Sequence, residues 1–198
     1  GIKPVGEAVR RAGLKFLLWF EPERICPGSL MAREHPEWVV LPPDGGWGMF
    51  NLAVPEARQY LTDYLNTSVK EYGISCVRID NAVSYNGLWE AVDRANPDRR
   101  GLAEIRYVEG LYRMWDDLLA ANPGLFIDNC ASGGGRIDLE TCARSIPLWR
   151  TDGTINPLLT GDFAQAAVQN QAMTAGLNRY VPFSVSGQMG ATPYLFRS

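Results

Sequence analysis

Short apolar runs alternate along the chain with longer stretches in which apolar residues recur at helical spacing. Near-continuous apolar runs are typical of strands buried on both faces of a parallel sheet, and strands separated by helices indicate βα units. The runs that we predict to be strands are LKFLLWF (14–20), ISCVRID (74–80), LFIDNC (125–130), IPLWRTD (146–152) and VPFSVSG (181–187).

The stretches between these runs carry helix signals. Pro55 stands at the position of a first helical residue and Gly73 ends the periodic pattern, which predicts a helix between them. A second amphipathic helix is predicted over about 102–121. The shorter predicted helices are 4–13, 137–144 and 161–177, and the predicted loops are 22–50 and the segment that carries Trp89 and Pro97.

The spacing of these elements fits either an open doubly wound sheet or part of a closed barrel. The polar residues favour the barrel, because each predicted strand ends in an acidic or polar group and such ends form a single mouth in a (β/α)8 barrel. A nucleotide-binding sheet would place a glycine-rich turn after its first strand, where this chain has EPE. We therefore predict an α/β fold of the (β/α)8 TIM-barrel type, as one domain over 1–198. The strand-end groups are Glu21, Glu23, Asp80, Asp128, Asn129, Asp152, Ser186 and Gln188.

Asp80 and Asp152 are the candidate catalytic residues. A carboxylate at the end of an apolar strand is costly unless it is solvated or hydrogen-bonded, which indicates a pocket. The alternative is that each simply caps the helix that follows. Two carboxylates that face each other across a barrel mouth are what cleavage of a glycosidic bond requires, one at the anomeric carbon and one at the leaving oxygen.

Other polar residues near the predicted mouth have two possible roles. Glu21 and Glu23 could line the mouth, but we favour anchoring of their loop, through a bidentate pair with an arginine such as Arg78 or Arg150. The loop SGGGR (132–136) lacks the lysine of a phosphate-binding loop. Its glycines would let backbone amides approach an uncharged sugar hydroxyl.

Aromatic side chains in loops are candidates for stacking on a sugar ring. We expect Trp47 or Trp89 to line the mouth, and give equal weight to a role of these residues in the core. We interpret His35 as a residue that packs its loop. The cysteines show no C-x-x-C spacing, and with a single histidine they leave little for a zinc site, so we predict buried free thiols. They are Cys26, Cys76, Cys130 and Cys142.

Composition and charge narrow the class of partner. The chain of 198 residues has 46% hydrophobic and 21% charged residues, as is ordinary for a globular protein. Its formal charge of −3 includes no basic stripe, which argues against nucleic acid and membrane surfaces as partners and favours a neutral one. The chain lacks an initiator Met, which fits either a processed chain or one cut from a larger protein, and because its first residues read as helix we expect the second. Its N-terminus also lacks the pattern of a signal peptide.

The segments GLKFLLWFEPERICPGSLMAREHPEWVV, WGMFNLAVPEARQYLTDYL, CVRIDNA, GLFIDNCASGGGRIDLE and IPLWRTD, in this order, resemble the catalytic barrel of family 36 glycoside hydrolases, the melibiase-type α-galactosidases. The resemblance implies a retaining enzyme without metal or cofactor that cleaves terminal α-linked galactose, or a close variant that acts on α-N-acetylgalactosaminides. It gives the role of nucleophile to Asp80 and that of acid/base to Asp152.

The resemblance also implies substrate-binding residues. Arg78 would reach substrate hydroxyls, and Cys130 would lie close to the galactose pocket. Many family members carry an asparagine two residues after the nucleophile, where this chain has Ala82, with Asn81 one position earlier. The full set that we predict to bind substrate is Arg78, Asn81, Cys130, Ser132, Gly133, Trp47, Trp89 and Arg150.

By the family's order, LKFLLWFEPE is the third barrel strand, so the chain would cover about strands 3 to 7. An incomplete barrel leaves strand edges exposed, which invites homo-oligomers. We expect weak or no activity from the chain alone, and an alternative function is that of a carbohydrate-binding barrel remnant. The expected partner is a galactose-containing oligosaccharide. Because galactosides are often met outside the cytoplasm, a secreted or periplasmic location is favoured over a cytoplasmic one.

Overall fold

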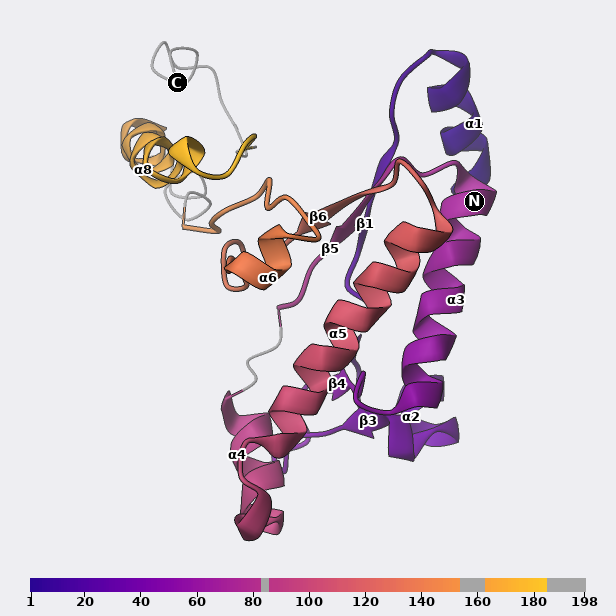
Figure 1. Ribbon diagram of the computed structural model, residues 1–198, viewed down its shortest axis with the longest axis vertical. Helices are drawn as coiled ribbons and strands as arrows, with labels where there is room; N and C mark the ends of the chain where they lie inside the picture. The colour runs from indigo at the N-terminus through magenta and orange to yellow at the C-terminus, as the bar shows by residue number, and fades with distance from the viewer. Residues whose placement is uncertain (83–85, 154–162, 185–198) are drawn as a thin grey trace. The chain divides into compact units, whose positions relative to one another are not determined.

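The computed structural model describes residues 1–82, 86–153 and 163–184 (Figure 1). The chain divides into two compact units, which we describe one at a time. The first unit comprises Gly1–Val77 with Asn81–Phe126, and the second comprises Arg78–Asp80 with Ile127–Ser198. That residues 1–198 form a single domain stays a prediction.

The strands β1 (Leu17–Phe20), β5 (Cys76–Ile79) and β6 (Phe126–Asn129) form a three-stranded sheet in the order β1-β5-β6. Val77 and Ile79 of β5 are fully buried, as is Ile127 of β6, so these two apolar runs form interior strands as predicted. For β1 the prediction of burial on both faces is wrong, because Leu17 is 41% and Trp19 51% exposed and the residues beside them are only partly buried. The α/β class with parallel strands is confirmed, and the described strands make up part of a barrel of the predicted type.

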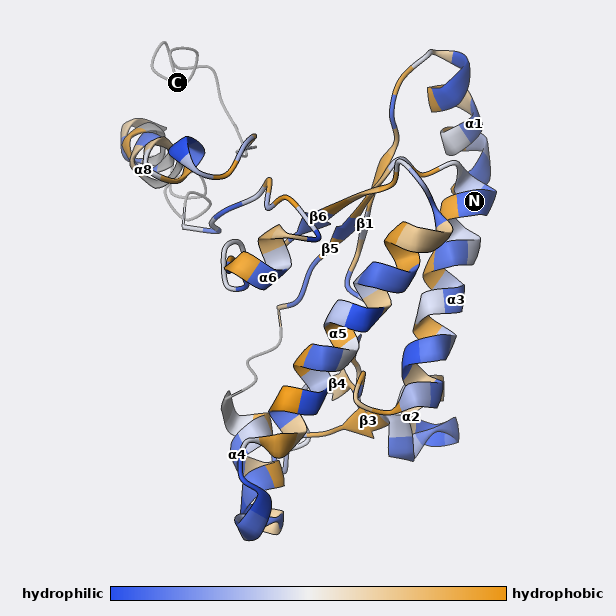
Figure 2. Ribbon diagram, in the orientation of Figure 1, coloured by the Kyte–Doolittle hydropathy of each residue, from blue (hydrophilic) through white to orange (hydrophobic). Residues whose placement is uncertain are grey.

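Two long helices pack together in the first unit. Helix α3 spans Pro55–Tyr72 and α5 spans Leu102–Ala121, as predicted, and Figure 1 shows them side by side. Gly73 ends α3 in the left-handed conformation, with φ of 66°. Polar and apolar residues are interspersed along both helices (Figure 2). Their buried apolar residues include Leu61, Leu65, Val69, Leu111, Met114, Trp115 and Leu118.

A shorter helix at the N-terminal end completes this packing. Helix α1 (Lys3–Arg11) contacts α3, as the sequence predicted for its first residues. Gly6 lies so close to the carbonyl of Tyr72 that a side chain there would overlap it.

In the described part of the chain, no helix has the length and apolar character that crossing a membrane requires.

The predicted loop over 22–50 is wrong, because this segment holds regular elements. The short strands β2, β3 and β4 form an antiparallel sheet in the order β2-β4-β3. Strands of two or three residues are too short to show an alternating pattern, which is why the sequence did not indicate them. The elements are β2 (Arg24–Ile25), α2 (Leu30–Glu34), η1 (Pro36–Trp38), β3 (Val39–Val40) and β4 (Gly48–Phe50).

The loop predicted around Trp89 is also wrong. Trp89 lies in a helix, α4 (Asn86–Ala95), which contacts α5 and is followed by η2 (Pro97–Arg99). Pro97 begins the second of these helices instead of marking a loop, as proline commonly does at a first helical position.

In the second unit, helix α6 (Leu139–Cys142) begins with a capping box between Asp138 and Thr141, inside the predicted helix 137–144. Helix α8 spans Phe163–Ala175 and is followed by η3 (Leu177–Arg179). Residues 181–184 form no strand, and the rest of the strand predicted over 181–187 lies outside the described residues, as do Ser186 and Gln188.

The segment 146–152 does not form the predicted strand, although it starts like one. Ile146 donates its N–H to the carbonyl of Ile127 in β6, as a neighbouring strand would. Pro147 then has no N–H to donate, and the N–H of Leu148 donates to the side chain of Asp128 at 2.9 Å. A side-chain carboxylate thus replaces the backbone partner of a regular ladder.

Candidate active site at the ends of β5 and β6

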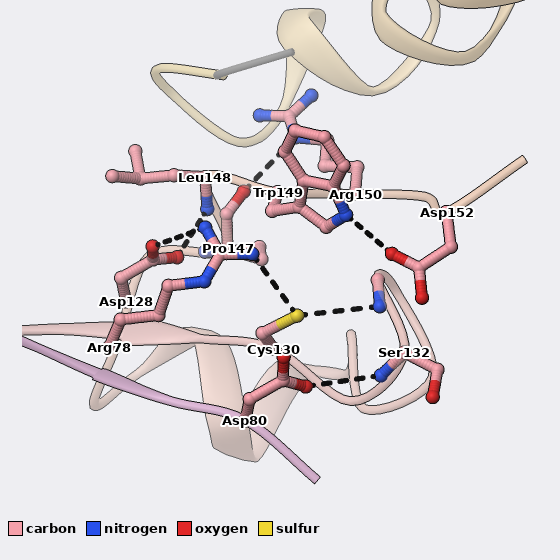
Figure 3. Close-up of polar contacts among 11 residues, drawn as sticks. Arg78, Asp80, Asp128, Cys130, Ser132, Pro147, Leu148, Trp149, Arg150 and Asp152 are labelled. Carbon is pink, nitrogen blue, oxygen red and sulfur yellow. Dashed lines mark hydrogen bonds and ion pairs between the residues drawn. The ribbon is translucent and has the colours of Figure 1, made fainter. Parts of the chain in front are cut away.

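The candidate site lies in the second unit, where β5 and β6 end. The N–H of Cys130 donates to the carbonyl of Ile79, which places the residues after the two strands next to each other. Arg78 donates from Nη1 to Oδ2 of Asp128 at 3.1 Å and from Nη2 to Sγ of Cys130 at 3.4 Å (Figure 3). The strand pairing therefore brings two of the predicted substrate-binding residues, Arg78 and Cys130, into contact.

Asp128 is buried and fixes the position of Arg78. It is 0% exposed, and each of its two oxygens has a partner, Arg78 on one side and the N–H of Leu148 on the other. Burial raises the pKa of Asp128 above its usual value, and the Leu148 N–H and the Arg78 charge oppose that rise. The sequence marked Asp128 only as a strand-end group, and its apolar neighbours Ile127 and Phe126 were the signal that its carboxylate is buried.

The glycine loop after β6 connects the two predicted catalytic residues. Asp80 accepts a hydrogen bond at Oδ1 from the N–H of Ser132 at 3.3 Å (Figure 3). The next residue, Gly133, forms an antiparallel bridge with Thr151, which immediately precedes Asp152. Both carboxylates thus flank one short loop.

Gly133 is the point of closest approach in this loop. Its φ is +87°, a conformation that side-chain-bearing residues rarely adopt, and an added Cβ would lie 2.5 Å from Cα of Thr151. Its N–H points at Sγ of Cys130 at 3.4 Å. Only glycine allows the two backbones to come this close.

Asp152 is exposed and is held by a tryptophan. The indole N–H of Trp149 donates to Oδ1 of Asp152 at 2.6 Å (Figure 3). The guanidinium carbon of Arg78 lies 5.5 Å from the centre of the Trp149 ring, within the range of a cation–π contact. The sequence did not predict this role of Trp149.

Cys130 is buried, with 1% of its surface exposed. Burial raises the pKa of its thiol to about 11, the nearby Asp80 adds to the rise, and the N–H of Gly133 opposes it. The thiol is therefore protonated and neutral at physiological pH.

Arg150 has a different role from the one predicted. It is 7% exposed, and its guanidinium donates to Oδ1 of Asn178 at 2.7 Å and to the carbonyls of Val181 and Phe183. It ties the segment before Asp152 to the residues after α8. Burial lowers its pKa below that of a solvated guanidinium. These contacts give no support to its predicted role in binding substrate.

In the first unit, the glutamates after β1 anchor their surroundings, as favoured from the sequence, but with other partners. Glu21 accepts at both of its oxygens from one nitrogen of Arg24, Nη1, at 3.0 and 2.9 Å, instead of forming the predicted bidentate pair with Arg78 or Arg150. Glu23 is fully buried and accepts hydrogen bonds from Asn81, at 3.2 Å, and from the hydroxyl of Tyr107.

The two tryptophans predicted to line the mouth differ in exposure. Trp47 is 51% exposed, with the guanidinium of Arg24 3.9 Å from its ring centre, and it lines a pocket of about 620 Å³. Trp89 is 9% exposed and packs against Tyr107, with ring centres 5.4 Å apart. Trp47 thus lines a pocket of the first unit and Trp89 lies in its core, and the contact of either with a sugar stays a prediction.

Two smaller predictions can also be compared with the structure. His35 stacks on Trp38 with ring centres 3.8 Å apart, which confirms its packing role. Cys76 and Cys130 are buried free thiols as predicted, but Cys26 is exposed and Cys142 is intermediate.

Comparison with known proteins connects this geometry to a family. The melibiase family profile matches residues 1–169. An α-galactosidase C from Emericella nidulans is 30% identical over 170 residues, which are 78% of this chain and 21% of that protein. The chain thus spans about a fifth of the length of the curated relatives that it matches.

Solved structures of α-galactosidases are also similar to this chain. The α-galactosidase from Lactobacillus brevis aligns with a TM-score of 0.70 at 27% identity, over 87% of this chain and 23% of that one. A variant of the family 36 α-galactosidase AgaA from Geobacillus stearothermophilus, in complex with 1-deoxygalactonojirimycin, aligns with a TM-score of 0.64 at 25% identity, over 78% of this chain and 22% of that one.

Proposed function

The chain belongs to the melibiase family, the family 36 glycoside hydrolases, and on that premise we propose that Asp80 and Asp152 are the catalytic pair of a retaining α-galactosidase. The observation that carries the proposal is the loop at Ser132 and Gly133, which contacts Asp80 on one side and the residue before Asp152 on the other. Two carboxylates that flank one short loop can act on the same glycosidic bond.

The proposed reaction has two displacements. Asp80 attacks the anomeric carbon of an α-galactoside while Asp152 donates a proton to the departing oxygen, which leaves a galactosyl ester on Asp80. Asp152 then removes a proton from water, and the water oxygen displaces Asp80 from the anomeric carbon. Retention of configuration requires the two carboxyl groups to lie roughly 5–5.5 Å apart in the competent enzyme.

The neighbours of Asp80 suit the binding of a neutral sugar. Arg78 offers a charged group whose position is fixed by Asp128, and the N–H of Ser132 in the glycine loop orients Asp80 itself. The protonated thiol of Cys130 adds no negative charge beside the nucleophile. A thiolate there would repel the carboxylate of Asp80.

The experiment compares two substrates in the intact protein that carries this sequence. Asp80→Ala should abolish turnover of both an activated aryl α-galactoside and raffinose. Asp152→Ala should lower kcat/KM strongly for raffinose, by about 10²- to 10⁴-fold, and far less for the aryl substrate, whose leaving group needs little protonation. Equal losses on the two substrates would contradict the acid role of Asp152.

A binding measurement separates the enzyme from a carbohydrate-binding remnant. Titration of the wild-type protein with 1-deoxygalactonojirimycin in a calorimeter reports binding without turnover. An enzyme binds this compound and hydrolyses the aryl substrate, whereas a remnant would only bind it. Absence of both would overturn the assignment to a galactose-directed site.

A further inference from the structure

We propose that Trp149 is a positioning residue that determines which oxygen of Asp152 exchanges the proton during the reaction. This inference rests on the proposed function, in which Asp152 is the acid and then the base. It concerns a residue that the sequence analysis did not place in the site.

Trp149 contacts Asp152 directly. The indole N–H of Trp149 is 2.6 Å from Oδ1 of Asp152, a short hydrogen bond in which the nitrogen can only donate. Within the part of the chain that the structure describes, Oδ2 of Asp152 has no hydrogen-bond partner in the protein. An oxygen that already accepts from an indole is poorly placed to deliver a proton, so Oδ2 is the oxygen that faces the leaving group.

Among the described residues, few other contacts constrain the side chain of Asp152. Its side chain is exposed, and it follows Thr151 in a bend and not in a helix or strand. An exposed carboxylate without a fixed partner rotates among rotamers and spends only part of its time in a reactive position. The hydrogen bond from Trp149 restricts that rotation.

Trp149 is itself held in place by Arg78 and, through Arg78, by Asp128. Arg78 lies over its ring, and the position of Arg78 is fixed by the buried carboxylate of Asp128. The same carboxylate accepts the N–H of Leu148, the residue before Trp149 (Figure 3). The ion pair of Arg78 and Asp128 therefore supports Trp149 at two points, at the face of its ring and at the backbone of the residue before it.

This arrangement connects the positions of Asp80 and Asp152 to that of Arg78. Arg78 precedes Asp80 by two residues on β5, and through Trp149 it also supports Asp152. A shift of Asp152 is therefore opposed by Trp149 and, through its ring, by the guanidinium of Arg78. For proton transfer in concert with nucleophilic attack, such relative alignment matters more than the position of either group alone.

The experiment uses Trp149→Phe in the intact protein. Phenylalanine keeps an aromatic ring for Arg78 to contact and removes only the N–H that reaches Asp152. We expect kcat/KM for raffinose to fall about 10- to 100-fold, part of the full effect of a general acid. For an activated aryl α-galactoside, kcat/KM should change by no more than about threefold, because departure of this leaving group requires little acid catalysis.

Trp38→Phe is the matched control. Trp38 packs on His35 and Phe50 in the first unit, and its replacement should leave the ratio of the two kcat/KM values unchanged. Azide adds a second test, since it can replace water as the nucleophile in the second displacement without a base. It should raise kcat of Trp149→Phe on the aryl substrate but not that of Trp38→Phe.

Two results would overturn the inference. Equal losses of kcat/KM on both substrates for Trp149→Phe would show that the tryptophan supports the fold or binds the sugar. No loss on either substrate would show that Asp152 needs no such support. Failure of the proposed function is distinguishable from both, because the wild-type protein would then not hydrolyse either substrate.

Discussion

Replacing Gly133 with alanine should separate the two catalytic carboxylates. Gly133 lies against Thr151, and an added methyl group would sit 2.5 Å from its Cα and 2.8 Å from its backbone nitrogen. Carbon atoms pack at about 3.5–4.0 Å, so one backbone must move by roughly 1 Å or more. Because Gly133 follows Ser132 and Thr151 precedes Asp152, that movement changes the distance between Asp80 and Asp152.

The expected effects differ in size. The positive φ of Gly133 costs about 1–2 kcal/mol for any residue with a Cβ, even where the space is open. The overlap with Thr151 also displaces the loop. Because the loop can move to relieve the overlap, stability measurements report only part of this effect. Misplacement of a catalytic group by about 1 Å can reduce the rate about 10²-fold. We therefore expect kcat/KM to fall about 100-fold, and the free energy of unfolding by about 2 kcal/mol.

Gly124→Ala separates the overlap from the backbone strain. Gly124 has nearly the same φ, +86° against +87°, and nothing lies within 4 Å of where its Cβ would be. Both variants should lose a similar free energy of unfolding in urea titrations, but only Gly133→Ala should lose activity on an aryl α-galactoside. If the two variants retain activity within about twofold of each other, the contact between Gly133 and Thr151 does not set the catalytic geometry.

Two further predictions concern buried groups in the site. The pKa of Cys130 rises from 9.0 to about 11 on folding. The contribution of the neutral thiol to stability is therefore complete below pH 9 and is lost as the pH rises towards 11. Urea titrations of the wild-type protein should show a loss of roughly 3 kcal/mol between these two pH values, and titrations of Cys130→Ser should not. Asp128→Asn keeps an acceptor for the Leu148 N–H but removes the charge that fixes Arg78. It should cost about 1–3 kcal/mol of stability and lower kcat/KM on both substrates. The control variant Glu140→Gln breaks the exposed pair with Arg144, so it should cost less than about 1 kcal/mol and leave activity unchanged.

The elements that the sequence predicted well are those whose signals are local. Pro55 and Gly73 define the ends of α3 by backbone restrictions that act wherever these residues occur. The apolar run ISCVRID identified β5 because a strand buried on both faces has few polar positions. Asp80 and Asp152 could be proposed because a charged residue at the end of an apolar run is unusual.

The features that the sequence did not predict depend on partners far along the chain. The segment 146–152 has the composition of a strand, but Asp128 takes the N–H of Leu148 and the ladder stops. Arg150 was expected to reach the substrate, but Asn178 and two carbonyls after α8 take its donors. Composition identified these side chains as polar and could not say which of many possible partners each would meet.

The different surroundings of the two aspartates agree with different proposed roles. Asp80 follows a buried strand, is half-buried, and has one oxygen fixed by the rigid backbone of the glycine loop, as suits a nucleophile that must meet one carbon atom at one angle. Asp152 is exposed, and its partner is a side chain that leaves one oxygen available. An acid/base residue must give up a proton to the leaving group and recover one from water in every cycle, so access to water is a requirement for Asp152.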